Sequence, residues 1–375
     1  MAIEYVEIRD ERRNIVGIID TAQSIIWHSV YNGVGDFEIY AQATEKHIGL
    51  LVAGNYVTRL NDAEIGIIEH IAVSFNVQSG RMITATGRFA KSILDRRHIY
   101  NLDGNTNKAT VFSGNVEAAA RKLVYDNAIG CLFDARRNIP ILELGALANL
   151  PDVIVDDNGN AASKQVSYAN LLTYTDSLLD EYKQAAMIIL DEDSKQLQYI
   201  VYKGADRSTD NTDGNEPIIF SQDFDNLNES EYTYDTAQEK TAALIGGEGE
   251  GLDRFYSLVA GAEIGLARRE TWVDASAVSK KYKDEQGEEK TYSDAEYKQM
   301  LDTLAKQELA PLVKIETFSG SIDITEGQFI LNQDFALGDI VTVQDNFLGK
   351  YINARVYETL ETQDENGYTV EAVYR

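Results

Sequence analysis

Alternating apolar and polar positions dominate the C-terminal residues 336–375. One run places Ile352, Ala354 and Val356 on one face, with polar or aromatic side chains between them. Asn366-Gly367 then supplies a turn, because both residues tolerate a positive φ. Period-two alternation with turn residues between the runs predicts an antiparallel meander of strands.

A similar pattern occurs near the N-terminus. The segment Gly54-Asn55-Tyr56-Val57-Thr58 matches Gly338-Asp339-Ile340-Val341-Thr342, and a turn signal follows each glycine at the same distance, at Asn61-Asp62 and Asp345-Asn346. Internal repeats decide the fold of a chain where they occur. We interpret the match as a weak repeat of one small β-barrel, with one copy near each end. Chance is the alternative, since Gly-x-x-Val-Thr is common in β proteins.

The middle of the chain has a different periodicity. Apolar residues at helical spacing predict helices over 115–125 and 167–182, and a short helix over 90–97. Strand patterns at 187–190 and 196–202 surround acidic turn residues and predict a hairpin. The middle third is therefore predicted to mix α and β structure.

Polar residues 204–216 indicate a domain boundary, after which strand patterns resume at 218–220. Residues 279–290 are charged without an apolar period and predict an exposed excursion. Ser293 and Glu296 form a capping-box pattern, which predicts a helix from there to about Leu309.

A chain of 375 residues is too long for one ordinary core. We predict an α+β, mainly β fold, with two similar antiparallel β-barrels and α/β and helical insertions. The first barrel takes residues 1–100 and an α/β insertion takes 101–215. The second barrel takes 216–275 and 311–375, and residues 276–310 form a charged loop and helix inserted into it.

Composition narrows the classes of function. The net charge of −27, from 34 basic and 61 acidic residues, argues against holding nucleic acid by neutralising its phosphates. The sequence has no apolar run long enough to span a membrane and no signal-peptide pattern at its start. A single cysteine, Cys131, cannot form an internal disulfide, which indicates a reducing compartment.

Candidate chemical groups do not combine into a site. The histidines have no zinc spacing, and Cys131 lies in an apolar setting typical of a packing thiol. The glycine-rich stretch 246–251 lacks a following Lys-Ser/Thr and carries two glutamates, so it predicts a close backbone approach rather than a phosphate loop. Asp206, Asp210 and Asp213 lack the EF-hand spacing. The histidines in question are His28, His47, His70 and His98. We therefore expect no catalytic, cofactor-binding or metal-binding residues and no enzyme activity.

The order of several motifs resembles the siphovirus-type phage tail-tip hub family, including the N-terminal hub of tail-associated lysins and the baseplate hub of contractile tails. The resemblance covers nearly the whole chain, by pattern rather than identity. The motifs are Gly33-Val34-Gly35-Asp36-Phe37-Glu38-Ile39; Ile67-Ile68-Glu69 with Gly87 and Ile93-Leu94-Asp95-Arg96-Arg97; Tyr202-Lys203-Gly204-Ala205-Asp206-Arg207-Ser208 with Phe220-Ser221; Gly247-Glu248-Gly249-Glu250 with Arg254, Gly265 to Glu270 and Asp274; and Gly338-Asp339 through Arg355-Val356 with Asn366-Gly367-Tyr368.

The resemblance implies a structural hub of the tail tip or baseplate, assembled in the host cytoplasm as a homotrimer. Two similar barrels per subunit would give a ring of six pseudo-equivalent units that matches a hexameric tail tube. The implied partners are the distal tail protein or tail-tube hexamer above, the tape measure protein, and a separate spike, fibre or lysin chain below. No sequence-specific nucleic acid, membrane-spanning segment or lytic domain is expected. Acidic side chains would either line the channel, so that DNA does not adhere, or keep the subunit soluble.

Two other classes of function fit a β-rich chain. A secreted carbohydrate-active protein would need a signal peptide and a carboxylate pair in an aromatic cleft. A receptor- or glycan-binding tail adhesin would need only an exposed binding surface, and it stays open as the alternative.

Overall fold

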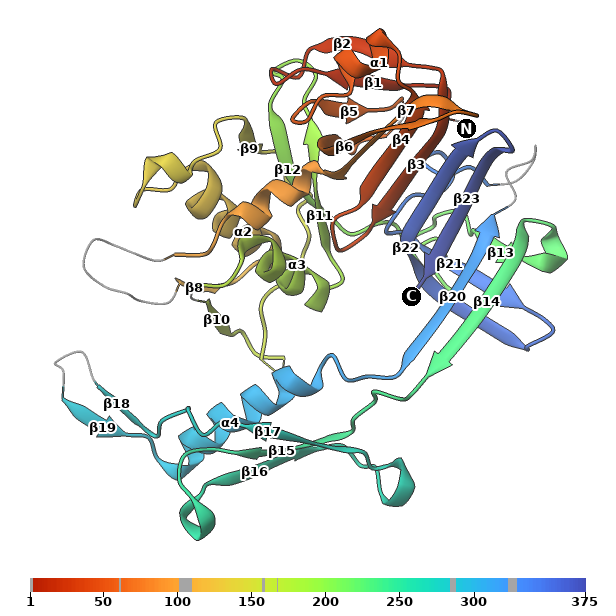
Figure 1. Ribbon diagram of the computed structural model, residues 1–375. Helices are drawn as coiled ribbons and strands as arrows, with labels where there is room; N and C mark the ends of the chain where they lie inside the picture. The colour runs from red at the N-terminus through yellow and green to blue at the C-terminus, as the bar shows by residue number, and fades with distance from the viewer. Residues whose placement is uncertain are drawn as a thin grey trace. The chain divides into compact units, whose positions relative to one another are not determined.

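The structure is a computed structural model that describes residues 3–60, 62–100, 110–156, 159–166, 168–283, 288–322 and 329–375. The chain forms two compact units, Met1–Glu231 with Phe318–Arg375, and Tyr232–Thr317. The predicted mainly β architecture is confirmed, because strands outnumber helices in both units (Figure 1). No helix among the described residues has the length and hydrophobicity needed to cross a membrane.

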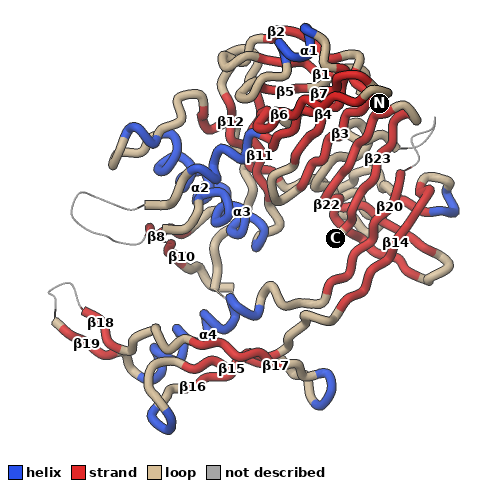
Figure 2. The backbone as a smooth tube through the Cα atoms, in the orientation of Figure 1, coloured by secondary structure: helices blue, strands red, loops and turns tan. Residues whose placement is uncertain are grey.

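One large sheet organises the first unit. Within the described residues its order is β14-β20-β23-β22-β3-β4-β7-β6-β5-β1-β2, with β21 paired to β22 and β13 paired to β21 (Figure 2). The strands are β1 (Val6–Arg9), β2 (Ile15–Ile19), β3 (Ala22–Val30), β4 (Asp36–Gln42), β5 (Tyr56–Thr58), β6 (Gly66–Asn76), β7 (Gly80–Phe89), β13 (Ile219–Ser221), β14 (Leu227–Asp235), β20 (Ile315–Ile322), β21 (Ile340–Asp345), β22 (Lys350–Asp364) and β23 (Gly367–Tyr374).

Two series of five strands in this sheet share one order. The strands β3 to β7 lie in the order β5-β6-β7-β4-β3, and the later series lies as β21-β22-β23-β20-β14. In both series the third, fourth and fifth strands form an antiparallel meander, and the second strand pairs with the fifth. The sequence match around the two glycines therefore marks a repeated arrangement of strands.

The two meanders also agree in local detail. Gly54 and Gly338, the matched glycines, have φ of 91° and 96°. The Gly54 N–H donates to the Ile68 carbonyl at 2.8 Å, and the Gly338 N–H donates to the Val356 carbonyl at 2.8 Å. A bulge follows Ile68 in β6 and follows Val356 in β22. A bulge bends and twists a strand, so its position sets the shape of each meander.

The prediction of two closed barrels is not confirmed. The strand β22 extends beyond β21, and its residues 358–363 pair with residues 25–30 of β3. This pairing joins the two series edge to edge, so in the described part of the chain they form one continuous sheet. A long strand can serve two neighbours in succession because each residue contributes its own backbone donor and acceptor.

The predicted helices of the insertion are confirmed, and each begins at an asparagine cap. The Asn115 side chain accepts from the Ala118 N–H at 2.9 Å, and Asn170 accepts from Thr173 at 3.1 Å. The predicted start of the second helix at Ser167 lies outside the described residues. The insertion contains α2 (Val116–Val124), α3 (Leu171–Glu181), β8 (Thr110–Ser113), β9 (Leu142–Leu144), β10 (Ser163–Val166), β11 (Ala185–Leu190) and β12 (Leu197–Tyr202).

Shorter helical turns connect the strands. The predicted helix at 90–97 is a 3-10 helix, Ala90–Arg96, and α1 (Glu45–Leu50) lies between β4 and β5. The remaining turns are Tyr125–Ile129, a π-helix, and the 3-10 helices Ala135–Arg137, Gln222–Phe224, Gly251–Asp253 and Gly265–Ala267.

The second unit is a small sheet covered by one helix. The sheet is β16 (Tyr256–Ala260), β15 (Ala242–Gly246) and β17 (Glu270–Asp274), and α4 (Asp294–Leu309) packs Tyr297 and Leu301 against it. The predicted capping box is confirmed, because Ser293 and Glu296 exchange side-chain to backbone hydrogen bonds. In the charged excursion, β18 (Lys281–Lys283) and β19 (Glu289–Thr291) pair antiparallel, and residues 284–287 lie outside the described residues. The four-part domain division stays a prediction.

Candidate assembly surface

The central strands of the main sheet bury one face and expose the other. Trp27 in β3 and Phe37 in β4 are buried, and their rings lie 5.8 Å apart. Successive residues of a strand point to opposite sides, so His28 and Asp36 lie on the other face. Within the first unit this face is accessible to solvent, because the side chains of His28 and Asp36 are 28% and 59% exposed.

This exposed face is acidic. A shallow groove of about 560 Å³ crosses it, and Glu231, Glu358 and Glu371 are among its lining residues. His28 also lines the groove, with Nδ1 3.2 Å from Asp36 and Nε2 3.5 Å from Glu358. The carboxylates come from four different strands, so they belong to the sheet rather than to one loop, and one of them, Glu358, is also paired with Arg375 at 3.0 Å.

One half of β6 has an open edge. The strand β5 pairs with β6 at residues 66 and 67, and no strand in the described part of the chain adjoins the same side of residues 70–76. Val73 is 50% exposed and Phe75 is 67% exposed. The position of β22 that matches Val73, counted from the bulge, is Glu361, which is buried where β22 pairs with β3. The strand edge that β3 covers on β22 is therefore uncovered at the matching part of β6.

A buried ion cluster fastens the two series to each other. Arg59, in the loop after β5, donates to Glu361 of β22 at 2.8 Å and to Asp62 at 2.9 Å. Each of these three side chains is less than 10% exposed. Burial lowers the pKa of Arg59, and the two carboxylates outweigh it, so the pKa is raised overall and the guanidinium stays charged.

Glu64 lies beside this cluster and is held neutral. The Ser29 hydroxyl donates to its carboxyl group at 2.6 Å. Burial, followed by the neighbouring Asp62 carboxylate, raises the pKa of Glu64 to about 8. A second negative charge next to Asp62 is unfavourable where water is scarce, so the carboxyl group keeps its proton at neutral pH.

Glu64→Gln is expected to make stability less sensitive to pH. Between pH 4.5 and about 8 the folded chain retains the Glu64 proton that the unfolded chain has released. Raising the pH through this window therefore destabilises the fold, by at most about 1.4 kcal/mol per pH unit from this group. Urea unfolding between pH 5 and 8 should show a smaller decline for the variant.

Glu69→Gln is the matched control. The hydrogen bond from Arg88 lowers the pKa of Glu69, so its contribution is lost only as the pH falls through that lowered pKa. The control should keep the wild-type slope between pH 5 and 8. Equal slopes for Glu64→Gln and wild type would show that Glu64 is ionised in the fold.

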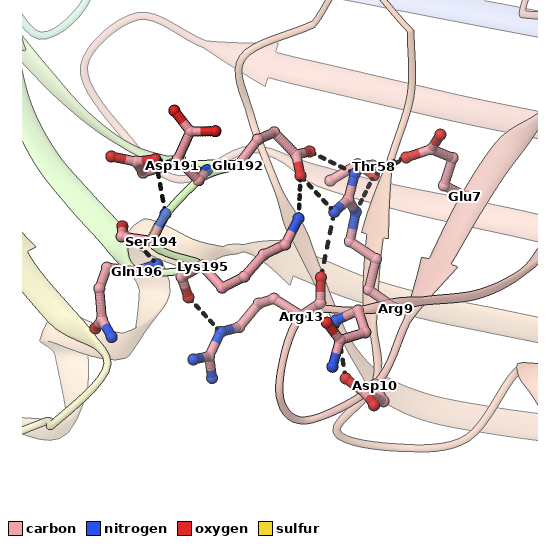
Figure 3. A network of polar contacts seen from close by, with 12 residues as sticks. Glu7, Arg9, Asp10, Arg13, Thr58, Asp191, Glu192, Ser194, Lys195 and Gln196 are labelled. Atoms are coloured by element: carbon pink, nitrogen blue, oxygen red, sulfur yellow. Dashed lines mark hydrogen bonds and ion pairs between the residues drawn. The ribbon is translucent and has the colours of Figure 1, made fainter.

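A second polar network attaches the insertion to the first series (Figure 3). Arg9 of β1 donates to Thr58 of β5 at 2.8 Å and to Glu192 in the β11–β12 turn at 3.0 Å. Lys195 donates to Glu192 at 2.6 Å, and Arg13 donates to the Lys195 carbonyl at 2.7 Å. The turn that was predicted as an acidic hairpin tip is therefore the attachment point of the insertion.

Two motifs far apart in the chain meet at the start of β21. The Asp339 carboxylate accepts from the Ala205 N–H at 2.7 Å and from Arg207 at 3.0 Å. A β-carbon added to Gly204 would lie 2.1 Å from the Gly338 carbonyl oxygen, so this position requires glycine. The central and C-terminal motifs of the resemblance thus form one structural unit.

The sequence-derived candidates for chemistry occupy structural positions. His47 is buried, with Nδ1 2.6 Å from the Gln42 carbonyl. The backbone of His98 forms an isolated antiparallel β-bridge with Asn170. His28 and His70 lie on the sheet, and Cys131 is a buried free thiol. The described residues contain no group of three or more acidic, histidine or cysteine side chains placed to hold a metal.

The glycine-rich stretch and the aspartate loop also have structural roles. A β-carbon on Gly247 would lie 2.5 Å from the Tyr297 hydroxyl, which confirms the expected close backbone approach. Asp206 accepts from the Ser208 N–H, and Asp210 accepts from Asn353. Asp210 therefore connects the loop to β22, and the Asp206 contact stabilises the loop itself.

Sequence reasoning missed Arg59, Glu361 and Glu64. Arg59 and Glu361 are separated by 302 positions in the chain. The available signal was an arginine and an aspartate three residues apart in a short loop, which is ordinary on a protein surface. Burial of the pair depends on where β22 runs, and a local pattern does not contain that information.

The comparisons agree with the motifs. A family model described as Siphovirus ReqiPepy6 Gp37-like protein matches residues 5–374. The chain belongs to this family of siphovirus tail proteins. No curated protein matches it in sequence.

Solved structures of tail proteins share the fold. The tail protein from Neisseria meningitidis MC58 is 14% identical with a TM-score of 0.56, and the match covers 99% of this chain and 95% of that one. The 43 kDa tail protein of prophage MuSo2 from Shewanella oneidensis is 13% identical with a TM-score of 0.56, covering 99% and 98%. At these identities the likeness shows the fold alone.

Proposed function

We propose that the chain is a structural hub of a phage or phage-like tail tip. Three copies form a ring that adapts a hexameric tail tube to a three-fold tip. The observation that carries the proposal is the repeated strand order, β5-β6-β7-β4-β3 and β21-β22-β23-β20-β14. A chain that presents nearly the same strands twice lets three subunits offer six similar surfaces.

The acidic sheet face lines part of the central channel in this proposal. Glu231, Glu358 and Glu371 lie along one groove on that face. Like charge keeps DNA from adhering as it passes, because phosphate binding depends on basic side chains that release counterions. A density map of the assembled tip in which this face turns away from the channel would overturn the assignment.

The partners follow from the position. The tail-tube hexamer or the distal tail protein lies above the ring, the tape measure protein ends near it, and a separate spike, fibre or lysin chain lies below. Membership of a tail protein family supports a place in the virion tail and a structural rather than catalytic role. We place assembly in the host cytoplasm, which accords with the free Cys131 thiol.

A second candidate function is a receptor- or glycan-binding adhesin. The second unit favours it, because the sheet face opposite α4 exposes Tyr256, Leu258 and Trp272. The Tyr256 and Trp272 rings lie 6.2 Å apart and are each about half exposed. An exposed aromatic patch of this kind is typical of a surface that binds a partner.

Deletion of the gene followed by electron microscopy separates the two functions. A hub is required for tail assembly, so we expect capsids without complete tails. An adhesin would be dispensable for assembly, and deletion would then leave complete particles that fail to bind cells. Restoring the full chain from a plasmid should restore tails, which excludes an effect on neighbouring genes.

A further inference from the structure

The pairing of β22 with β3, which connects the two strand series and is called the joint here, suggests how neighbouring subunits are connected. Inside the chain, residues 358–363 of β22 pair antiparallel with residues 25–30 of β3. The counterpart of β22 in the first series is β6, and the counterpart of β3 in the second series is β14. The strand β14 stands at the end of the sheet order within the described residues, and the outer half of β6 has an open edge. One chain therefore has two unpaired strand edges, on β6 and on β14, that could form a second antiparallel pairing of the same kind.

We propose that the stretch 70–75 of β6 in one copy pairs antiparallel with β14 of the next copy, in the part of β14 that belongs to the first unit, residues 227–231. This inference rests on the proposed ring and names the surface that closes it. The bulges define the correspondence, since His70 follows the β6 bulge as Glu358 follows the β22 bulge. His70 to Phe75 then correspond to the six residues of β22 that pair with β3.

The side chains of β6 support this occupant. Val73 and Phe75 correspond to Glu361 and Gln363, and the Val73 position is half exposed where Glu361 is 4% exposed. An exposed strand edge with apolar side chains is a template for pairing with another chain. The edge has no proline and no bulge beyond Ile68 to block a new strand. In the proposed pairing, β14 of a second copy gives β6 the backbone partners and the cover that β3 gives to β22 inside the chain.

The geometry is head to tail, because each copy donates a β6 edge and a β14 edge to different neighbours. A head-to-tail contact closes into a ring when its rotation divides a full turn, and otherwise continues as a filament. The rotation that relates the two series inside one chain would recur at the joint. Three copies then place six series around one axis.

Disulfide trapping between two single-cysteine proteins tests the joint. In a Cys131→Ser background, one protein carries Ala72→Cys or Ser74→Cys, and the other carries a cysteine at one position from 227 to 231. Mixing and mild oxidation should give a linked dimer at one β14 position for each β6 position. Antiparallel pairing predicts that moving two residues forward on β6 moves the best partner two residues back on β14. Thr369→Cys, exposed on β23 within the sheet, is the control that should not link.

The proteins used for trapping must fold and associate as the wild type does. Val73→Lys should abolish linking, because a charged side chain on a strand edge blocks pairing, while Val77→Lys in the following turn should not. Circular dichroism of both variants should match wild type, which separates loss of pairing from loss of folding.

The outcomes distinguish the joint from the ring. The alternating pattern of links together with a trimer mass by light scattering supports both. The pattern with filaments or another copy number supports the strand pairing and overturns the trimer. A trimer without links at these positions, or no links under any condition, overturns the strand pairing.

Discussion

Arg59→Met is expected to lower the free energy of unfolding by about 3–5 kcal/mol. The substitution leaves Glu361 and Asp62 buried next to each other without their cation. A buried carboxylate that loses its counter-charge must either take up a proton or remain charged at high cost. The loss should therefore be smaller at pH 5 than at pH 8.

Tryptophan fluorescence can follow this unfolding in the first unit alone. The chain has two tryptophans, and Trp27 is buried in the main sheet while Trp272 lies in the second unit. In a Trp272→Phe background, urea unfolding reports the surroundings of Trp27. The ring of Trp27 lies 5.0 Å from the Arg59 guanidinium, so the probe is next to the change.

Arg88→Met is the control for the loss of a positive charge. Arg88 pairs with Glu69 at 2.8 Å, and both side chains are partly exposed. An exposed pair contributes about 0–1 kcal/mol, so the control should change little. The double variant Arg59→Met/Glu361→Gln should recover part of the lost stability, because one uncompensated charge is removed. A loss for Arg59→Met no larger than that of the control would show that the cluster is solvated.

Gly338→Ala is expected to destabilise the chain by about 3 kcal/mol or more, whereas Gly54→Ala should cost about 1–2 kcal/mol. Both glycines have positive φ, so alanine is strained at either position. Only at Gly338 would the added methyl group meet a neighbour, because its β-carbon would lie 2.5 Å from the Tyr31 ring. The space around Gly54 is open within 4 Å.

Tyr31 cannot easily move aside. It is 1% exposed, and its hydroxyl oxygen lies 2.9 Å from the carbonyl oxygens of both Lys183 and Lys203, between which its one hydrogen is shared. The two glycine variants therefore compare one backbone strain in two environments. Urea unfolding of both variants measures the difference directly. Equal losses would mean that the environment of Tyr31 adapts to the methyl group without cost.

The local elements were the most predictable part of the fold. The capping box at Ser293 and Glu296 and the helix over 115–125 follow from interactions within a few residues, and both are present. The meander after Gly338 is also local, because each turn connects strands that pair with each other. Short-range hydrogen bonds and side-chain alternation act wherever the chain goes, so a sequence pattern can identify them.

The closed barrels were not confirmed because closure depends on which strand edges meet. The sequence of β22 contains an alternating run, and nothing in that run says that its second half pairs with β3, more than 300 positions earlier. The same holds for the assembly surface, where the open half of β6 is defined by the absence of a neighbour in the described sheet.

The amino-acid sequence by itself determined the mainly β character, the matched glycine segments, the capped helices and the motif order of the tail protein family, because each depends on short-range interactions or on pattern. Only the tertiary structure decided that the two strand series join through β22 and β3, that Arg59 and Glu361 are buried together, and that the carboxylates share one face. These features depend on contacts between distant segments, and their energies arise only when folding removes water from both partners.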